Sequence, residues 1–310
     1  MALFMNKTLV AVKKETTYGT DPTLAGTDCF LVSNVSLTPL AGNSATRDFV
    51  RPYFGQSSSI QLDQYVELSF DVELASSGTA GTRPAFGDAL LACGLEETIT
   101  ATTDAVYTPV SADFDSVTIE VYMDGILHQM TGARGSFSLS IARGAIPMLS
   151  FRFTGNYVAP ADATPLTPDF SDFKIPKGAN ATNTQTITLL GESLCMESFS
   201  LDISNNLVHR DLPGCDPACL ITDRAPSGTL VFEAPTVTTY NWVEAARLKT
   251  SGALQIVHGT AAGSIVQIDA PAVTLNPPSY QDSDGVMMLS APLVFEPTSS
   301  GNDEIELTFK

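Results

Sequence analysis

Alternating apolar and polar residues dominate the chain, and they predict β-strands. The longest alternation runs from Ile60 to Leu74, where apolar residues recur at nearly every second position and acidic or polar residues stand between them. A period of two is the pattern of a strand with one buried face and one solvated face. A second alternation, Val117 to Met123, leads into Asp124-Gly125, a dipeptide typical of two-residue hairpin turns, and predicts a return strand from Ile126 to Met130. Another hairpin is predicted between Phe137–Ile141 and Ile146–Phe153, with its turn at Arg143-Gly144.

Only two segments have the spacing of a helix. Pro84 to Cys93 has proline near its first turn, apolar residues at helical spacing and Gly94 just beyond its end. Trp242 to Lys249 has Glu244 early and basic residues late, which suits the helix dipole. The pattern therefore predicts a mainly β protein with two short helices.

The second half of the sequence repeats strings of the first half in the same order, which favours a tandem duplication of one β domain. Each string alone is weak evidence, because short apolar and serine-rich strings recur by chance. The matching strings are Val35-Ser36-Leu37 with Phe199-Ser200-Leu201, Arg47-Asp48 with Arg210-Asp211, Leu68–Asp71 with Leu230–Glu233, the helix around Phe86 with the helix around Trp242, Ile119–Val121 with Leu254–Ile256, and Ile146–Ser150 with Val286–Ser290.

This repeat divides the chain into an N-terminal arm (residues 1–27), a first domain (28–155), a Pro-rich linker (156–185) and a second domain (186–310). A Thr-rich insertion at 95–116 distinguishes the first copy from the second. Two similar domains fused head to tail can occupy adjacent places in a ring, so three chains would supply six quasi-equivalent places. A closed pseudo-sixfold assembly is the natural expectation.

Composition narrows the class of function. The 310 residues carry 16 Lys and Arg against 34 Asp and Glu, a net charge of −18. This balance argues against an electropositive groove that grips nucleic acid. No apolar run approaches the ~18 residues of a membrane helix, and Met1 to Lys14 lacks a signal-peptide core, so we expect a protein made and used without secretion or membrane contact. Five cysteines are an odd number and predict free thiols.

The candidate chemistry is sparse. His209, Cys215 and Cys219 are a zinc-like ligand set, but their spacing matches no standard zinc motif, and two ordinary thiols in a loop are the favoured interpretation. Asp282-Ser283-Asp284-Gly285 resembles the start of a calcium loop but lacks the later ligands, which favours a turn between strands. Nucleophile-elbow, phosphate-loop, dinucleotide and zinc-protease motifs are absent from the sequence. We therefore predict no catalytic, cofactor-binding or metal-binding residues and no enzyme activity.

Several motifs give the chain a family likeness. The run Glu15-Thr16-Thr17-Tyr18-Gly19-Thr20-Asp21, with Arg47-Asp48, Arg51–Gly55, Ser77–Thr82 and Gly132–Gly135, resembles the tail tube (major tail) proteins of phages with long, non-contractile tails. The resemblance covers essentially the whole chain. Its motifs are structural and carry no active site.

The resemblance implies a β-sandwich with one flanking helix for each tube domain. The inner strands of neighbouring domains would join into a barrel around a channel, and stacked rings would conduct genomic DNA into the host. Most chains of this family carry one tube domain and form hexameric rings. The duplication here departs from that pattern and predicts trimeric, pseudo-hexameric rings instead.

The implied partners are other copies of the chain, a tape measure protein in the lumen, tail tip and tail terminator proteins, and passing DNA bound without sequence specificity. The implied location is the phage tail of the virion, assembled in the host cytoplasm. Acidic walls would let DNA slide, whereas basic walls would hold its phosphates. Two strand faces are candidates for the lumen: the acidic face of Asp63, Glu67, Asp71 and Glu73, which is otherwise an ordinary solvated strand face, and the small polar face of Ser136, Ser138 and Ser140.

Contacts between rings are expected from the N-terminal arm or from the insertion, for which Leu95, Thr102, Tyr107 and Ser116 are the candidate residues. Two other classes of function compete with the tube. A tandem β-sandwich adhesin or carbohydrate-binding module would expose aromatic platforms, and the chain has a single Trp. A hydrolase using clustered carboxylates would need a deep pocket that the sequence does not reveal.

Overall fold

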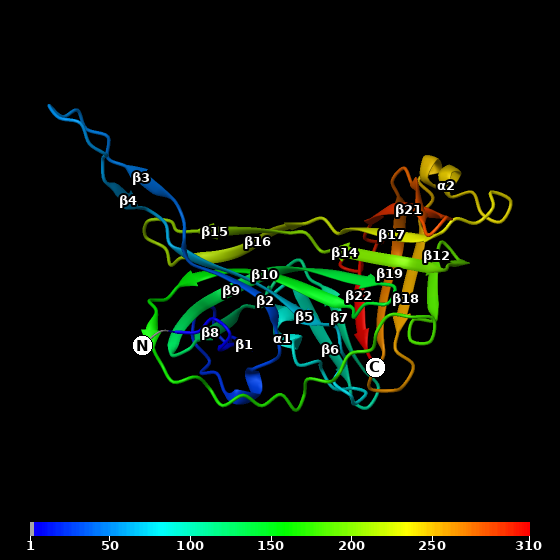
Figure 1. Ribbon diagram of the computed structural model, residues 1–310, viewed down its shortest axis with the longest axis horizontal. Coiled ribbons are helices and arrows are strands. Elements are labelled where there is room, and N and C mark those ends of the chain that lie inside the picture. Colours follow the sequence, from blue (N-terminus) through cyan, green and yellow to red (C-terminus); the bar gives the residue numbers. More distant parts are fainter. Residues whose placement is uncertain (1–2) are drawn as a thin grey trace.

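The computed structural model describes residues 3–310, so Met1 and Ala2 of the expected N-terminal arm lie outside it (Figure 1). We call residues 3–162 the first half and residues 186–310 the second half. The elements of the first half are β1 (Thr8–Lys14), a short 3-10 turn η1 (Gly26–Asp28), β2 (Ser33–Ala41), β3 (Ser44–Thr46), β4 (Ser59–Gln61), β5 (Tyr65–Glu73), α1 (Gly87–Leu91), β6 (Leu95–Thr100), β7 (Asp104–Pro109), β8 (Val117–Met123), β9 (Ile126–Ala142), β10 (Met148–Tyr157) and β11 (Ala161–Asp162).

The second half has the same character, with strands and one short helix. Its elements are β12 (Thr186–Leu189), β13 (Glu192–Ser193), β14 (Met196–Asp202), β15 (Asn205–Arg210), β16 (Ala218–Arg224), β17 (Ser227–Glu233), α2 (Trp242–Leu248), β18 (Gly252–His258), β19 (Val266–Leu275), β20 (Ser279–Ser283), β21 (Val286–Phe295) and β22 (Glu306–Phe309). The mainly β fold with two short helices is confirmed.

One antiparallel arc of eight strands runs through both halves. Its order is β2, β5, β10, β9, β14, β17, β21 and β20, and each neighbouring pair is hydrogen-bonded. The seam between the halves is the β9–β14 ladder, in which Ser138 to Ala142 pair with Ser198 to Asp202. No separate interface divides the halves along this arc, because the ladder continues across the seam.

The core lies on one side of this arc. Alternate side chains of its strands are almost completely buried, among them Phe70, Phe151, Phe137, Phe199 and Phe232. A second layer of strands covers them. It contains β1 paired with β8, and the series β6, β7, β22, β19, β18 and β12. The C-terminal strand β22 pairs with β7 of the first half as well as with β19, so the covering layer also joins the two halves.

The two halves share their strand connections. In the first half, β2 pairs with β5, β5 with β10, and β10 with β9; in the second half, β14 pairs with β17, β17 with β21, and β21 with β19. In each half a hairpin separates the first two of these strands, and a helix follows the second. This is the connectivity that a duplicated domain would have.

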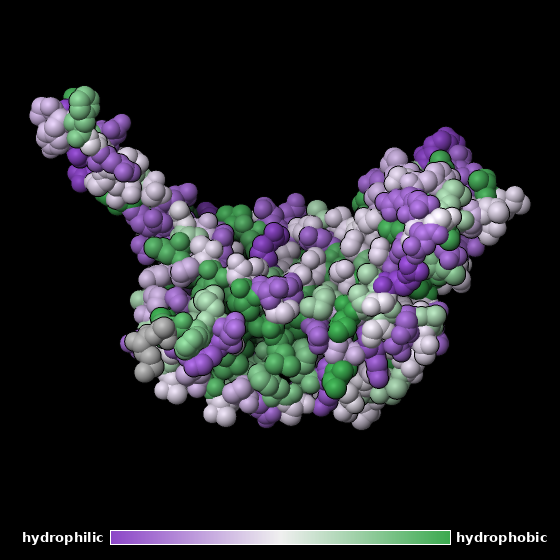
Figure 2. Space-filling model, in the orientation of Figure 1, coloured by the Kyte–Doolittle hydropathy of each residue, from purple (hydrophilic) through white to green (hydrophobic). Residues whose placement is uncertain are grey.

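The two hairpins differ in where they lie. The hairpin of residues 205–224 (β15–β16), which we call the docked hairpin, runs along the first half (Figure 1). The hairpin of residues 42–62 (β3–β4), which we call the projecting hairpin, extends away from the body of the molecule. Figure 2 shows that it stands clear of the rest of the surface.

Local predictions agree with most elements and fail at two places. The alternation from Ile60 to Leu74 is divided between β4 and β5, because Leu62 N–H donates to Asn43 O within the projecting hairpin and the chain then turns into β5. The segments expected at 126–130 and 137–141 form one 17-residue strand, β9. The Asp124-Gly125 turn has positive φ at both residues, 46° and 102°, as its sequence predicts.

Candidate functional site

The side of the eight-stranded arc opposite the core is polar. Residues directly opposite each other in an antiparallel ladder share a face, so the pairing registers decide which side chains lie together. Asp71 pairs with Ser150, Ser150 with Ser138, and Ser138 with Asp202, which forms one polar row across four strands and across the seam. The acidic and the serine faces expected from the sequence are therefore parts of a single surface, which we call the polar face.

The polar face carries more negative than positive charge. Its side chains include five carboxylates and one guanidinium among small hydroxyl residues: Glu67, Ser69, Asp71, Glu73, Ser150, Arg152, Ser138, Ser140, Ser200, Asp202 and Glu233. Ser136, the third serine expected on this face, is 2% exposed, and its Oγ accepts a hydrogen bond from the Asn205 N–H. The side chains between the charged residues are short and carry hydroxyl groups. The face can hold a hydrated, negative potential without any concentration of cations.

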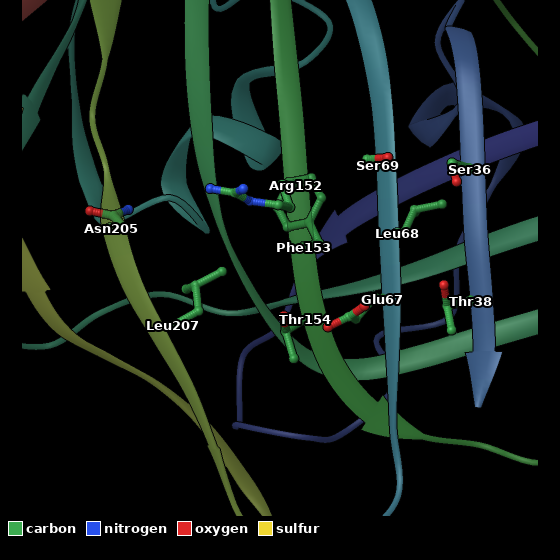
Figure 3. A pocket seen from close by; sticks show the side chains of 10 residues that line it. All are labelled: Ser36, Thr38, Glu67, Leu68, Ser69, Arg152, Phe153, Thr154, Asn205 and Leu207. Atoms are coloured by element: carbon green, nitrogen blue, oxygen red, sulfur yellow. The ribbon is translucent and has the colours of Figure 1, made fainter. Parts of the chain in front are cut away.

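The polar face has shallow hollows along it and no single deep cleft among the described residues. One of about 390 Å³ lies between Glu67 and Thr154 on one side and Asn205 and Leu207 on the other, and Arg152 points into the same region (Figure 3). A second, of about 340 Å³, is lined by Asp71, Ser138, Asp202 and their neighbours. Asp71 is oriented by the Asn34 side chain, whose Nδ2 donates to Oδ2 at 2.7 Å.

Asp63 lies apart from the other three acidic candidates. It stands between β4 and β5, where the strand is interrupted, and its Oδ1 lies 3.1 Å from Nδ1 of His209. His209 belongs to the docked hairpin, and its ring also packs on Tyr65 at 5.1 Å between centroids. Asp63 thus helps to hold a hairpin in place, a relationship that alternation alone gives no means of finding.

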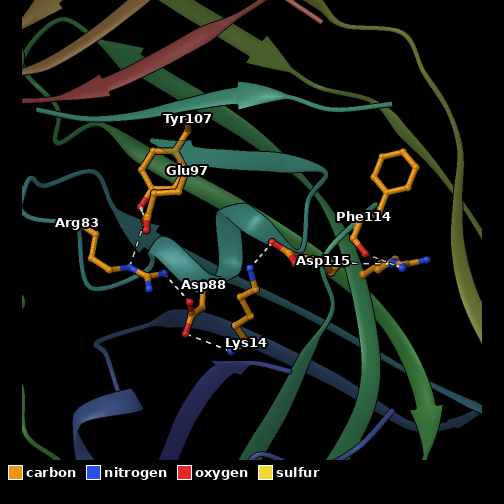
Figure 4. Close-up of polar contacts among 8 residues, drawn as sticks. Lys14, Arg83, Asp88, Glu97, Tyr107, Phe114 and Asp115 are labelled. Carbon is orange, nitrogen blue, oxygen red and sulfur yellow. Dashed lines mark hydrogen bonds and ion pairs between the residues drawn. The ribbon is translucent and has the colours of Figure 1, made fainter. Parts of the chain in front are cut away.

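The insertion at 95–116 forms the β6–β7 hairpin within the covering layer. Of its four candidate residues, Leu95, Tyr107 and Ser116 are buried, and Thr102 lies at the exposed turn with a φ of 62°. Tyr107 donates a hydrogen bond to Glu97, beside Arg83 and Asp88 of the α1 region (Figure 4). Burial raises the pKa of the Tyr107 hydroxyl. Of the four candidate residues, Thr102 is the one that another molecule could reach.

The Glu15–Asp21 run is held by a buried carboxylate. Glu15 is 5% exposed and accepts hydrogen bonds from the Gly19 and Gly132 N–H groups and from the Ser116 and Thr118 hydroxyls, at 2.6–2.7 Å. These bonds fasten the N-terminal segment to β8 and β9. The motif could be found in the sequence, but the four donors come from three separate segments, so its structural role could not.

The Tyr18 hydroxyl connects the same run to the docked hairpin. It donates to Gly132 O at 3.1 Å and accepts from the Cys219 N–H at 2.6 Å. Burial is the largest cause that raises the pKa of Tyr18. A phenol that stays protonated retains its donor role in this position.

The arc has two unpaired edges. Within residues 3–310, β2 pairs only with β5 and β20 pairs only with β21, so each has one free edge of backbone donors and acceptors. Exposed edges of this kind invite pairing with another chain. Sequence reasoning did not single out β20, a five-residue strand that follows Pro277-Pro278.

A family model described as phage tail tube protein matches residues 5–309. The chain belongs to the phage tail tube protein family. No curated protein matches it. As a tail tube protein, the chain is a structural component of the virion that assembles with copies of itself into a tube.

The other chemical candidates do not converge in this tail tube protein. His209 contacts Asp63, Cys219 is buried opposite it across the β15–β16 ladder, and Cys215 is exposed at the tip of the docked hairpin. No group of three or more His, Cys, Asp or Glu residues suited to a metal ion occurs in the part of the chain that the structure describes. Asp282 to Gly285 forms the β20–β21 turn, in which Gly285 N–H donates to Asp282. Among the described residues, no helix is long and apolar enough to span a membrane.

Proposed function

We propose that three copies of this tail tube protein close into a ring by pairing β2 of one copy with β20 of the next. The observation that carries this proposal is the seam between β9 and β14, an antiparallel junction between two halves with the same strand connections. The same junction repeated between chains uses both free edges. Three arcs of eight strands give a barrel of twenty-four, more than the ~16 to 18 strands that already leave an aqueous channel.

The two halves are two tube domains, and the ring is pseudo-hexameric. The domains span residues 28–155 and 186–310, joined by the Pro-rich linker at 156–185, with residues 1–27 as an N-terminal arm. The shared pairing order of the halves supports this division. Fusion of the two domains places half of the junctions within single chains, so fewer junctions remain to be formed between chains.

The polar face lines the channel, and genomic DNA passes along it during ejection. Each chain contributes more carboxylates than cations to this face, so the DNA phosphates gain no counterion-release attraction to the wall. DNA is carried without sequence-specific binding. Before ejection the tape measure protein occupies the same lumen, tail tip and terminator proteins close the ends of the tube, and assembly takes place in the host cytoplasm.

Stacking of rings uses the exposed parts of the segments named from the sequence. The turn at Thr102 is one. The N-terminal arm offers another, because Leu3, Phe4 and Met5 are 55%, 58% and 72% exposed. Apolar side chains at this level of exposure gain free energy when another ring covers them.

The proposal is tested by light-scattering mass and electron microscopy on the same purified sample. Rings of three chains, alone or stacked into tubes, are expected. Two edge variants, Tyr280→Pro and Gln281→Pro, sharpen the test, because neighbouring residues of a strand direct their N–H groups to opposite sides. The variant whose lost N–H points away from β21 loses only a donor of the free edge, so it should block ring closure while leaving thermal stability nearly unchanged. The other variant also loses a hydrogen bond to β21 within its own chain. Chains that stay monomeric in all conditions, even with tail-tip complexes added as initiators, would contradict the proposal.

A further inference from the structure

The two hairpins hold corresponding places in the two halves, but one is docked and the other is not. The docked hairpin follows β14 and the projecting hairpin follows β2, and both strands are the first in their half of the arc. The docked hairpin lies on the first half, on the other side of the β9–β14 seam (Figure 1). The projecting hairpin follows β2, whose corresponding edge is unpaired in a single chain.

The docked hairpin is held by specific contacts. The Asn205 side chain, in a residue 7% exposed, donates to Cys93 O at 2.6 Å and Gly135 O at 2.9 Å. Ile221 is 8% exposed and its Cδ1 reaches the backbone at Gly94, just after α1. The hairpin therefore covers three places on the first half: the chain that leads into β5, the end of α1 and the middle of β9.

The projecting hairpin exposes a set of apolar side chains that no part of its own chain covers in the described structure. Their exposures range from 49% to above 100%, and Figure 2 shows apolar side chains at its tip; they are Phe49, Val50, Tyr53, Phe54, Ile60 and Leu62. Single exposed apolar residues are ordinary, but six on one projecting hairpin mark an interaction surface.

We propose that the projecting hairpin docks on the second half of a neighbouring copy in the same ring, as the docked hairpin does on the first half of its own chain. This inference rests on the ring proposed above, because β2 must lie beside β20 of the next copy. The receiving surface is then the end of β16 around Asp223, the residues after α2 around Thr250, and Asn276 after β19. All three residues are exposed.

Charge favours the same arrangement. In the docked hairpin, His209 meets Asp63 in front of β5. The projecting hairpin carries Arg47 near the corresponding place, and the receiving surface presents the exposed carboxylate of Asp223 in front of β17. An arginine meeting a carboxylate selects this register over one that brings like charges together.

Cysteine cross-linking in assembled rings tests the docking. Ile60→Cys and Thr250→Cys are combined in a chain whose two exposed thiols are removed by Cys195→Ser and Cys215→Ser, and assembled protein is treated with a short bismaleimide. Ile60 lies in the return strand of the projecting hairpin, as Ile221 lies in the return strand of the docked hairpin. Ile221 packs beside Gly94, which follows α1, and Thr250 is the residue that follows α2 in the same way. We expect covalent dimers and trimers on a denaturing gel. The control pair is Ile175→Cys with Thr250→Cys. It should give monomers, because Ile175 is also accessible to the reagent but lies in the linker and outside the projecting hairpin.

The outcomes separate the hairpin from the ring. A ladder that continues beyond trimers would place the hairpin on a chain of another ring and overturn the inference. Intact rings or tubes by electron microscopy without any cross-link would overturn the inference and leave the proposed function standing. A sample without rings or tubes would overturn both.

A second variant measures what the apolar tip contributes. Phe49→Ser with Phe54→Ser should raise the concentration needed for assembly at least tenfold while the unfolding midpoint of the unassembled chain stays unchanged, because both side chains are exposed in the single chain. The matched control is Ile175→Ser, which should assemble at the ordinary concentration. Unchanged assembly of the double variant would contradict the docking.

Discussion

Leu139 of the first half stands directly opposite Leu201 of the second half in the β9–β14 ladder, and each residue is 1% exposed. The seam between the halves is thus part of the core as well as part of the hydrogen-bonded arc. Two halves joined in this way are expected to unfold together, because separating them would expose both the ladder and its apolar side.

Reversing charge on the polar face should slow the passage of DNA. The variant Glu67→Lys with Asp71→Lys and Asp202→Lys replaces three carboxylates by ammonium groups that attract phosphates through counterion release. Particles carrying it should release DNA more slowly, and more so at low salt, with tube length unchanged. Asp162→Lys with Asp172→Lys changes exposed carboxylates outside the arc and should leave the rate unaltered. Normal ejection by the triple variant would contradict an electrostatic role for this face.

Removing the charge of Glu15 should destabilise the fold by about 2–4 kcal/mol, because its four donors are then only partly satisfied. In Glu15→Gln, an amide NH₂ group replaces one carboxylate oxygen, so the N–H and O–H groups that donated to this oxygen face another donor. Denaturant unfolding monitored by circular dichroism measures the change. Glu233→Gln, at an exposed position, is the control and should change stability by less than about 0.5 kcal/mol. Equal effects of the two substitutions would argue against the buried carboxylate as a fastening.

Two neighbouring asparagines provide a matched test of the docked hairpin. Asn205→Ala removes both donors to Cys93 O and Gly135 O and should cost about 1–3 kcal/mol of unfolding free energy. Asn206→Ala removes an exposed contact to Thr222 within the hairpin and should cost much less. Hydrogen exchange should also accelerate in residues 205–224 of the first variant alone. Exchange rates that rise equally in both variants would show that Asn205 is not the anchor.

His258 should make stability depend on pH. Its ring is buried, with Nδ1 2.8 Å from the Thr184 hydroxyl and Nε2 3.0 Å from Lys177 O, an arrangement that fits the neutral imidazole. Burial lowers the pKa of His258, so below about pH 6.5 the unfolded chain binds a proton that the folded chain does not.

The free energy of unfolding should therefore fall between pH 7.5 and 5.5, and His258→Gln should flatten that dependence. Burial lowers the pKa of His128 as well, so this residue contributes in the same direction in both proteins and the difference between them isolates His258. Parallel pH profiles for the two proteins would exclude His258 as the titrating group.

The sequence by itself determined the local elements. Alternation in β5 and β10 is visible because one face of each strand is buried, and the Asp124-Gly125 turn is visible because few residues tolerate positive φ. The helix at Trp242 is visible because Glu244 stands in its first turn and basic residues stand at its end, which suits the helix dipole. These signals depend on residues a few positions apart.

Only the tertiary structure decided which strands are neighbours. Alternation assigns Glu67 and Ser138 each to the wet face of a strand, but it cannot place them on the same surface, because every strand offers the same backbone donors and acceptors. Nor can it tell that Asp63 leaves the strand to meet a histidine 146 residues away. The seam, the free edges and the different positions of the two hairpins follow from long-range packing, in which burial of side chains from both halves selects one pairing among many that local sequence allows.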